Sequence, residues 1–209
     1  MIAVRRYLLV LCVLALGGCT TLPPFTLNKV TVWKSPVLAL WFHTPEECAA
    51  TLGIQLVPAA TADEADVALT WGVPINTHKN YQVGSANLSI ISNDAGLLGT
   101  ERAQLVSWFV NGTGPSLVLY PLQDDVMQVF TQRYLSGSPV SRSAELALDH
   151  QQMIVAVSQD GQHLGVLPSV LIPPHLKELD RVDDIPVLAS TIQEPSGPAK
   201  DLIACMQAK

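Results

Sequence analysis

Apolar residues along the chain fall into short runs that alternate between the spacing typical of strands and that typical of helices. Strands are predicted at 30–33, 54–58, 66–70, 83–92, 116–121 and 163–167. Helices are predicted at 36–42, 44–52, 100–111, 124–136 and 151–158. The run at 66–70 has apolar residues on both faces, as is typical of a buried parallel strand. This alternation predicts an α/β fold with a largely parallel sheet.

Residues that favour helix ends divide these runs. Thr44, Thr100 and Asp124 each precede a helical pattern and are predicted as N-caps, because their side-chain oxygens can accept from the first free backbone N–H groups. Gly53 and Gly112 follow helical patterns and are predicted to end them. The pair at 160–161 (Asp-Gly) predicts a turn before the last strand, and Asp183 with Asp184 predicts a solvated turn.

The N-terminus has the pattern of a bacterial lipoprotein signal. Arg5 and Arg6 precede about ten apolar residues at 7–16, and small residues lead directly to Cys19. We therefore expect residues 1–18 to be removed and Cys19 to carry the lipid. An ordinary secretory signal, or an N-terminal helix that happens to end in cysteine, is the alternative.

Composition describes the body that follows this signal. Residues 19–27 contain two prolines and are predicted to be a tether, and 48% apolar with 14% charged residues indicates a globular domain. Without Arg5 and Arg6 the chain has ten basic and 18 acidic side chains, a net charge of about −8. Such a surface excludes nucleic acid as a partner and gives no attraction to an anionic membrane, so attachment depends on acyl chains. We expect the protein in the cell envelope, facing the periplasm or the cell exterior.

Four cysteines leave one pair for the folded body. Cys12 would leave with the signal and Cys19 would carry the lipid, so Cys48 and Cys205 remain in an oxidising compartment. They form either a disulfide or two buried thiols.

Motifs of catalysis and of metal binding are missing from the sequence. The five histidines do not have the spacing of a helical metal pair, and neither Gly-x-Ser-x-Gly nor a glycine-rich phosphate loop occurs. We therefore predict a protein that is not an enzyme and needs no cofactor or metal.

Four segments together resemble the phosphate-binding branch of bacterial type 2 periplasmic substrate-binding proteins, which feed ABC importers. They are 65–72 (ADVALTWG), the strand at 88–92, 99–112 (GTERAQLVSWFVNG) and 161–168 (GQHLGVLP). The resemblance spans most of residues 28–190. It implies two α/β lobes joined by crossing strands, with a small solute, possibly an oxyanion, bound in the interlobe cleft and delivered to an ABC permease.

The resemblance also divides the chain. Lobe 1 is expected to hold 28–82 and 181–209, and lobe 2 is expected to hold 83–180. The C-terminal stretch would then return to lobe 1, which would bring Cys205 into the same lobe as Cys48 and make a disulfide between them easier.

Ligand-binding candidates follow from the rule that ligands of α/β folds bind at the carboxyl ends of strands. They are Ser35, Thr70, Trp71, Ser92, Asn93, Asp94, Gln123, Asp124 and Asp125. Each has a plainer interpretation as a helix cap, a core residue or a solvent-exposed turn. The acidic pair at 124–125 departs from the hydroxyl-rich, arginine-containing turn of phosphate receptors, because carboxylates compete with an anion for the same amides. The sequence thus indicates a solute receptor without a standard phosphate site, or a lipoprotein that uses the fold to bind a protein or for a structural role.

Overall fold

The computed structural model describes residues 28–159 and 162–209. The predicted signal at 1–18, the lipidation site Cys19, the tether at 19–27 and the turn at 160–161 lie outside these residues.

Eight strands form one mixed sheet with the order β2-β1-β3-β8-β4-β7-β5-β6. β1 lies between β2 and β3 and is parallel to both, and β5 is parallel to β7 and β6. The strands are β1 (Asn28–Lys34), β2 (Ile54–Pro58), β3 (Val67–Trp71), β4 (Lys79–Ser92), β5 (Ser116–Leu119), β6 (Glu145–Leu146), β7 (His163–Pro168) and β8 (Lys177–Thr191).

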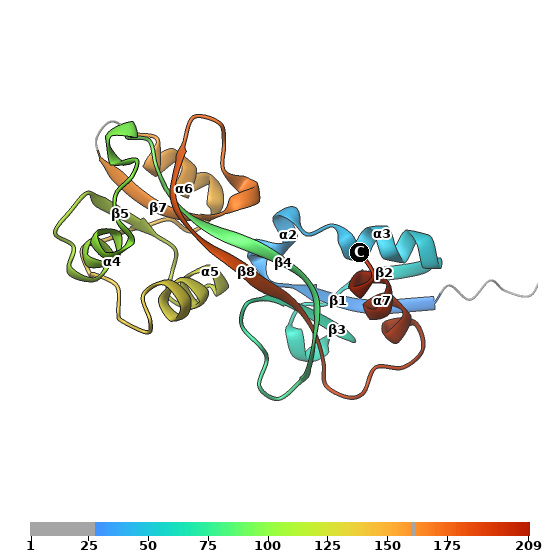
Figure 1. Cartoon of the computed structure of the whole chain (residues 1–209). Coiled ribbons are helices and arrows are strands. Elements are labelled where there is room, and N and C mark those ends of the chain that lie inside the picture. The colour runs from blue at the N-terminus through green and yellow to red at the C-terminus, as the bar shows by residue number, and fades with distance from the viewer. Residues whose placement is uncertain (1–27, 160–161) are drawn as a thin grey trace, which may run out of the picture.

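Two long central strands connect the two parallel groups. β4 and β8 are antiparallel to each other along nearly their whole length, from Lys79 opposite Thr191 to Ser92 opposite Lys177. At one end β8 pairs with β3, and at the other end β4 pairs with β7. Both strands therefore cross from one parallel group to the other (Figure 1).

The helices divide between these two groups. Lobe 1 contains α2 (Pro36–Trp41), α3 (Thr44–Leu52) and α7 (Gly197–Gln207) around β1, β2 and β3. Lobe 2 contains α4 (Arg102–Asn111), α5 (Asp125–Val129) and α6 (His150–Val157) around β5, β6 and β7. Figure 1 shows the two lobes towards the two ends of the crossing strands. The predicted two-lobed α/β architecture is confirmed.

Short helical turns complete the connections. They are η1 (Ala62–Glu64), η2 (Ala95–Leu97), the π-helical turn η3 (Phe130–Tyr134), which continues α5, and η4 (Ser169–Leu171). No helix in the described part of the chain is long and apolar enough to span a membrane.

The crossing strands change two expectations. Asp183 and Asp184 lie inside β8 rather than in a linker turn, but they form an irregularity in the strand. The pairing with β4 passes from Ile185 directly to Val182, and Asp184 has a positive φ of 53°. The expected boundaries at 82/83 and 180/181 cut through β4 and β8, so both strands belong to both lobes.

The predicted helix ends agree in part. Asp124 is the N-cap of α5, and Gly53 and Gly112 end α3 and α4 in the left-handed conformation. The predictions for Thr44 and Thr100 are wrong. Thr44 is the first residue inside α3, and the Thr100 hydroxyl donates back to the Leu97 carbonyl at 2.7 Å, which leaves Glu101 as the N-cap of α4.

The body is held together by a common apolar core and by one covalent link. Large side chains such as Trp71, Phe109 and Phe130 are fully buried. Cys48 of α3 and Cys205 of α7 form a disulfide, with 5.9 Å between their Cα atoms. The C-terminal helix is thereby fixed to lobe 1.

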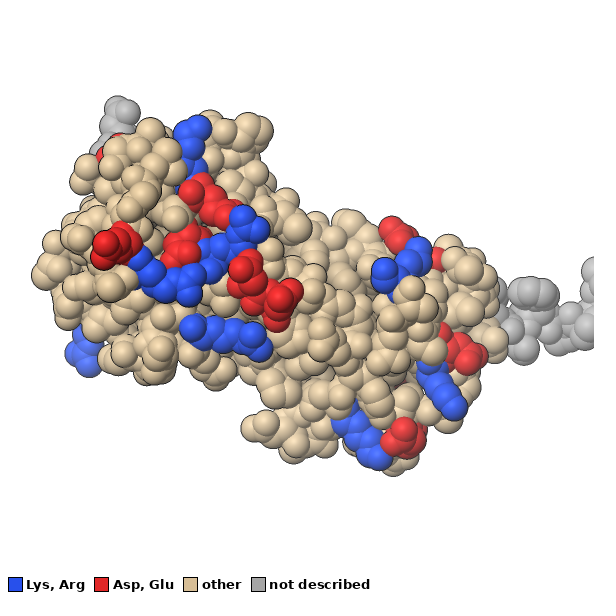
Figure 2. All heavy atoms as spheres, viewed as in Figure 1, with Lys and Arg blue, Asp and Glu red and all other residues tan. Residues whose placement is uncertain are grey.

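A network of charged residues covers one face of lobe 2. Arg102 of α4 donates from Nε and Nη2 to the Asp180 carboxylate of β8 at 2.7 and 2.8 Å. The Tyr134 hydroxyl also donates to this carboxylate, at 2.8 Å, and its ring lies under the Arg102 guanidinium. Figure 2 shows acidic and basic side chains interleaved on this face.

Candidate functional site

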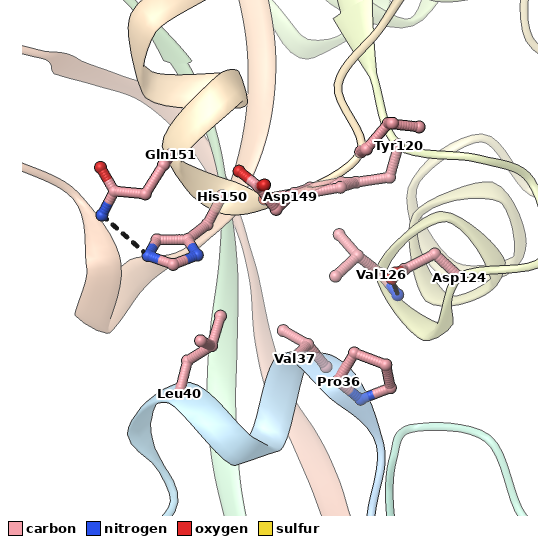
Figure 3. A pocket seen from close by; sticks show the side chains of 10 residues that line it. Pro36, Val37, Leu40, Tyr120, Asp124, Val126, Asp149, His150 and Gln151 are labelled. Atoms are coloured by element: carbon pink, nitrogen blue, oxygen red, sulfur yellow. Dashed lines mark hydrogen bonds between the residues drawn. The ribbon is translucent and has the colours of Figure 1, made fainter.

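A cavity of about 270 Å³ lies between the two lobes. Its lobe 1 wall is the face of α2 formed by Pro36, Val37 and Leu40. Figure 3 shows this face opposite side chains of lobe 2. The lobe 2 wall consists of Tyr120, Asp124, Val126, Leu148, Asp149, His150 and Gln151.

Strands from both parallel groups position these walls. β1 leads through Ser35 into α2, β5 leads through Tyr120 into the turn before α5, and β6 leads towards α6. The carboxyl ends of parallel strands are where helices begin and where α/β folds bind ligands. The cavity thus lies at the position where the fold places a ligand.

Carboxylates of the chain itself cap both lobe 2 helices at this cavity. Asp124 Oδ1 accepts from the Val126 backbone N–H at 2.8 Å, and Asp149 Oδ1 accepts from the Gln152 N–H at 2.8 Å. These amides are the donors that an oxyanion would need at a helix start. They are already bonded, so the helix starts disfavour an anionic ligand.

The charged side chains that line the cavity are acidic. Burial raises the pKa of Asp124 and the neighbouring Asp125 charge raises it further, while the hydrogen bond from the Val126 amide acts in the opposite direction. Burial also raises the pKa of Tyr120, with smaller contributions from Asp124 and Asp149, so its phenol stays protonated. Within 28–159 and 162–209, no Lys or Arg lines the cavity or pairs with these carboxylates.

The predicted ligand-binding residues of lobe 1 lie in the core or in a turn. Trp71 is fully buried and packs edge-to-face on Trp41 at 6.1 Å between ring centroids, so its side chain belongs to the core. The Thr70 hydroxyl donates to the Val73 carbonyl at 2.7 Å and stabilises the turn after β3. Ser35 is fully buried beside the α2 wall.

The acidic turn of lobe 2 reaches the interlobe region through two of its three predicted residues. Asp124 lines the cavity, and the Asp125 carboxylate accepts from the Trp71 backbone N–H of lobe 1 at 3.4 Å. Gln123 is exposed, and its carbonyl accepts from the Gln128 side chain at 3.0 Å.

The structure does not bring Ser92, Asn93 and Asp94 to the cavity. They follow β4, which is antiparallel to β7, and β7 is parallel to β5. The carboxyl end of β4 therefore lies at the opposite edge of the sheet from that of β5. There the Asn93 amide donates to the Gln159 carbonyl at 2.6 Å and Asp94 accepts from the Gly96 N–H at 2.7 Å.

Several lining residues were not among the sequence candidates. Asp149 was identifiable in principle, because it lies two residues before the helical pattern at 151–158 and has a preferred N-cap side chain. β6 is only two residues long, too short to give an alternating pattern, so the strand end that leads to Leu148 is not visible in the sequence.

No group of three or more His, Cys, Asp or Glu side chains in the described residues is arranged to hold a metal ion. The two carboxylates that line the cavity, Asp124 and Asp149, are therefore separate groups in otherwise largely apolar walls.

A scan of protein-family models and a sequence search among curated proteins find no match. Solved structures do match. An ABC-type phosphate transport receptor from Vibrio cholerae superposes with a TM-score of 0.65 at 15% identity, over 85% of this chain and 93% of the receptor. A Clostridium perfringens protein, described as a phosphate ABC transporter substrate-binding protein with bound phosphate, superposes with a TM-score of 0.69 at 8% identity, over 86% and 93%.

The same fold occurs in regulators. The regulatory domain of CcmR from Synechocystis, in complex with 2-PG, superposes with a TM-score of 0.64 at 11% identity, over 87% of this chain and 96% of that domain. At such low identity the likeness establishes the fold, which is the two-lobed α/β fold of type 2 periplasmic binding proteins. The named neighbours include both transport receptors and a regulatory domain, so the fold by itself does not specify a function.

Proposed function

We propose that this protein is a lipid-anchored extracytoplasmic receptor that binds a small solute between its lobes and delivers it to an ABC-type importer. The observation that supports this most is the cavity of about 270 Å³, which has walls from both lobes. A solute held there contacts α2 on one side and the starts of α5 and α6 on the other. Binding energy can then hold the two lobes together in the form that a permease would recognise.

The walls suggest which solutes fit. Pro36, Val37, Leu40, Val126 and Leu148 give an apolar surface, and Asp124 and Asp149 add carboxylates. A small solute with an apolar body, either uncharged or carrying an amine, matches this lining better than an oxyanion. The protein is in this respect a phosphate-receptor-like fold without a standard phosphate site.

The lipid anchor is the other part of the proposal. Acylation of Cys19 at the end of the signal pattern would hold the body at the outer surface of a membrane through residues 19–27. A receptor tethered in this way stays close to its permease, which raises their effective concentration. We propose binding and not catalysis as its activity.

A thermal-shift screen of uncharged, cationic and anionic metabolites on residues 20–209 tests the proposal. A solute at 100 times its dissociation constant stabilises by about 2.7 kcal/mol, which is about 5 to 10 °C in a domain of this size. Leu148 is 69% exposed at the cavity wall, so Leu148→Trp blocks the cavity without removing core contacts. Leu98→Trp is the matched control, because Leu98 is 53% exposed and lies outside the cavity.

The expected result is a solute that raises the melting temperature of the wild type and of Leu98→Trp but not of Leu148→Trp. A screen in which no solute shifts the wild type, or in which Leu148→Trp responds equally, contradicts a receptor with its site in this cavity.

A second candidate is a lipoprotein that uses the fold for protein or structural contacts. It is favoured by Leu40 and Leu148, which are 42% and 69% exposed at the cavity wall and could contact a protein segment. Crosslinking in whole cells from positions 40 and 148 would capture a protein partner in that case. A solute receptor predicts a crosslink from these positions only to its permease.

A further inference from the structure

Asp125 is the first residue of α5 in lobe 2, yet its carboxylate contacts lobe 1. Its Oδ2 accepts from the Trp71 backbone N–H at the end of β3, at 3.4 Å. The Ser35 hydroxyl, at the end of β1, is fully buried and makes no hydrogen bond of normal geometry with the described residues. It nevertheless lies close enough to Asp125 to favour the charged carboxylate. Two donors from adjacent parallel strands thus face one carboxylate from the other lobe.

Packing fixes Asp125 at this position. Gly72, which follows β3, has a φ of +72°, and a Cβ at that position would lie 2.4 Å from Val129 Cγ2 of α5. The short helix α5 therefore lies directly against the end of β3, with its last residue on Gly72. The Gly72 N–H donates to the Pro186 carbonyl of β8 at 2.8 Å, which holds this end of β3 against the crossing strand.

The charge of Asp125 has donors near it but no cation. Burial raises the pKa of Asp125, while the Ser35 hydroxyl and the Trp71 amide act in the opposite direction. None of the described lysines or arginines forms an ion pair with it. A carboxylate that accepts from a backbone N–H and has a buried hydroxyl without another partner beside it has surroundings like those of a bound oxyanion.

We infer that Asp125 is a specificity-determining residue, a built-in oxyanion that fills the anion position at the ends of β1 and β3 and so excludes free oxyanions from the cleft. This inference rests on the proposed function only in treating the interlobe region as the ligand site. Removal of the carboxylate, with the two donors left in place, creates a site for a small oxyanion such as formate or phosphate.

The charge of Asp124 does not prevent a free oxyanion from taking the place of the Asp125 carboxylate. Asp124 already lies beside the Asp125 charge, which contributes to its raised pKa. A singly charged oxyanion in the place of Asp125 replaces that charge and adds none. Formate and acetate, with one charge and a planar carboxylate, are therefore expected to bind at least as well as phosphate.

Chemical rescue tests the inference. Wild type, Asp125→Ala and Asp125→Asn are titrated with formate, acetate and phosphate at constant ionic strength, with chloride as the reference anion, and followed by calorimetry and thermal melting. Asp125→Asn is the matched control, because its amide is neutral but still occupies the space of the carboxylate. A Ser35→Ala change in the Asp125→Ala background tests the second donor.

The expected result is that Asp125→Ala binds formate at least tenfold more tightly than the wild type and Asp125→Asn do, and that Ser35→Ala weakens this binding three- to tenfold. Equal binding by Asp125→Asn and Asp125→Ala overturns the inference, because charge alone and not occupancy would then exclude anions. A folded Asp125→Ala that binds no oxyanion also overturns it and makes Asp125 a structural contact only.

The wild type gives a test that does not depend on the folding of any variant. Phosphate or formate binding to the wild type at millimolar concentration contradicts a filled anion position. The metabolite screen of the wild type is a separate experiment. If the screen finds a solute but Asp125→Ala binds no oxyanion, the receptor function stands and only the role of Asp125 is removed. If Asp125→Ala binds an oxyanion but the screen finds no solute, the role of Asp125 stands and the receptor function is removed.

Discussion

Cys48 in α3 is bonded through its sulfur to Cys205 in α7, 157 positions later in the chain. The two helices pack on the same side of lobe 1, so the bond closes a loop that contains both crossing strands and all of lobe 2. A disulfide stabilises a protein mainly by restricting its unfolded chain, and more so when the loop is long.

We expect reduction of this disulfide to lower the free energy of unfolding by about 2 to 5 kcal/mol. Urea unfolding with and without reductant measures the change. The Cys48→Ala/Cys205→Ala double variant is the control, because it should match the reduced wild type and not respond to reductant. A wild type whose unfolding midpoint is the same in both conditions contradicts the prediction.

Gly72 should tolerate no side chain. Gly72→Ala places a Cβ 2.4 Å from Val129 and 2.8 Å from Ile185, at a positive φ. The expected loss is about 2 to 4 kcal/mol, from overpacking and from the left-handed conformation. Gly99→Ala is the matched control, because Gly99 has a φ of +83° with no atom within 4 Å of the added Cβ. It should cost about 1 to 2 kcal/mol, and equal losses for both variants would show that α5 does not press on the end of β3.

Asp180 should contribute to stability only above acidic pH. Its hydrogen bonds from Arg102 lower its pKa from an ordinary 3.8 to about 2. The folded form therefore favours the charged carboxylate, and this stability is present above pH 3.8 and lost as the pH falls through about 2. Since the Arg102 side chain is 58% exposed, the contribution is about 1 kcal/mol at most.

Asp180→Asn should flatten the decline of the unfolding free energy in this acidic range, as measured by urea unfolding at a series of pH values. Asp183→Asn is the control in the same strand, because Asp183 has only a 3.7 Å contact with Arg181. The same acid dependence in Asp180→Asn and the wild type would contradict the assignment.

Asp124 should have the opposite effect on the pH dependence. Its pKa is raised, so the folded form binds a proton more tightly than the unfolded form, and stability from this group falls as the pH rises from 3.8 through the raised value. Asp124→Asn keeps a residue that caps helices well and removes the titration. We expect this variant to lose less stability than the wild type between acidic and neutral pH, and an identical pH profile would contradict the buried position of this carboxylate.

Much of the fold could be predicted from the sequence, since β3, α4, β5 and β7 have clear apolar periodicity. β8 was missed because its first half is polar and half-buried, with Asp183 and Asp184 exposed. Its pairing with β4 is set by long-range contacts, which no local pattern reports.

The site was only half predictable for a similar reason. The strand-end rule singled out Asp124 and Asp125, and N-cap chemistry marked Asp124 as the helix start, because both signals are local. The wall formed by Val37 and Leu40 depends on which face of α2 meets the other lobe, and the sequence does not specify it. The strand-end rule failed for Ser92 to Asp94 because it requires the direction of each strand, and β4 runs opposite to β7.

The central claim is that a solute binds between the lobes. Hydrogen–deuterium exchange with the solute that gives the largest melting shift in the screen tests it directly. The account predicts protection on both sides of the cavity at once, in α2 and in the starts of α5 and α6. Protection confined to one lobe, or to a surface away from residues 36–40, 120–126 and 148–151, would contradict it.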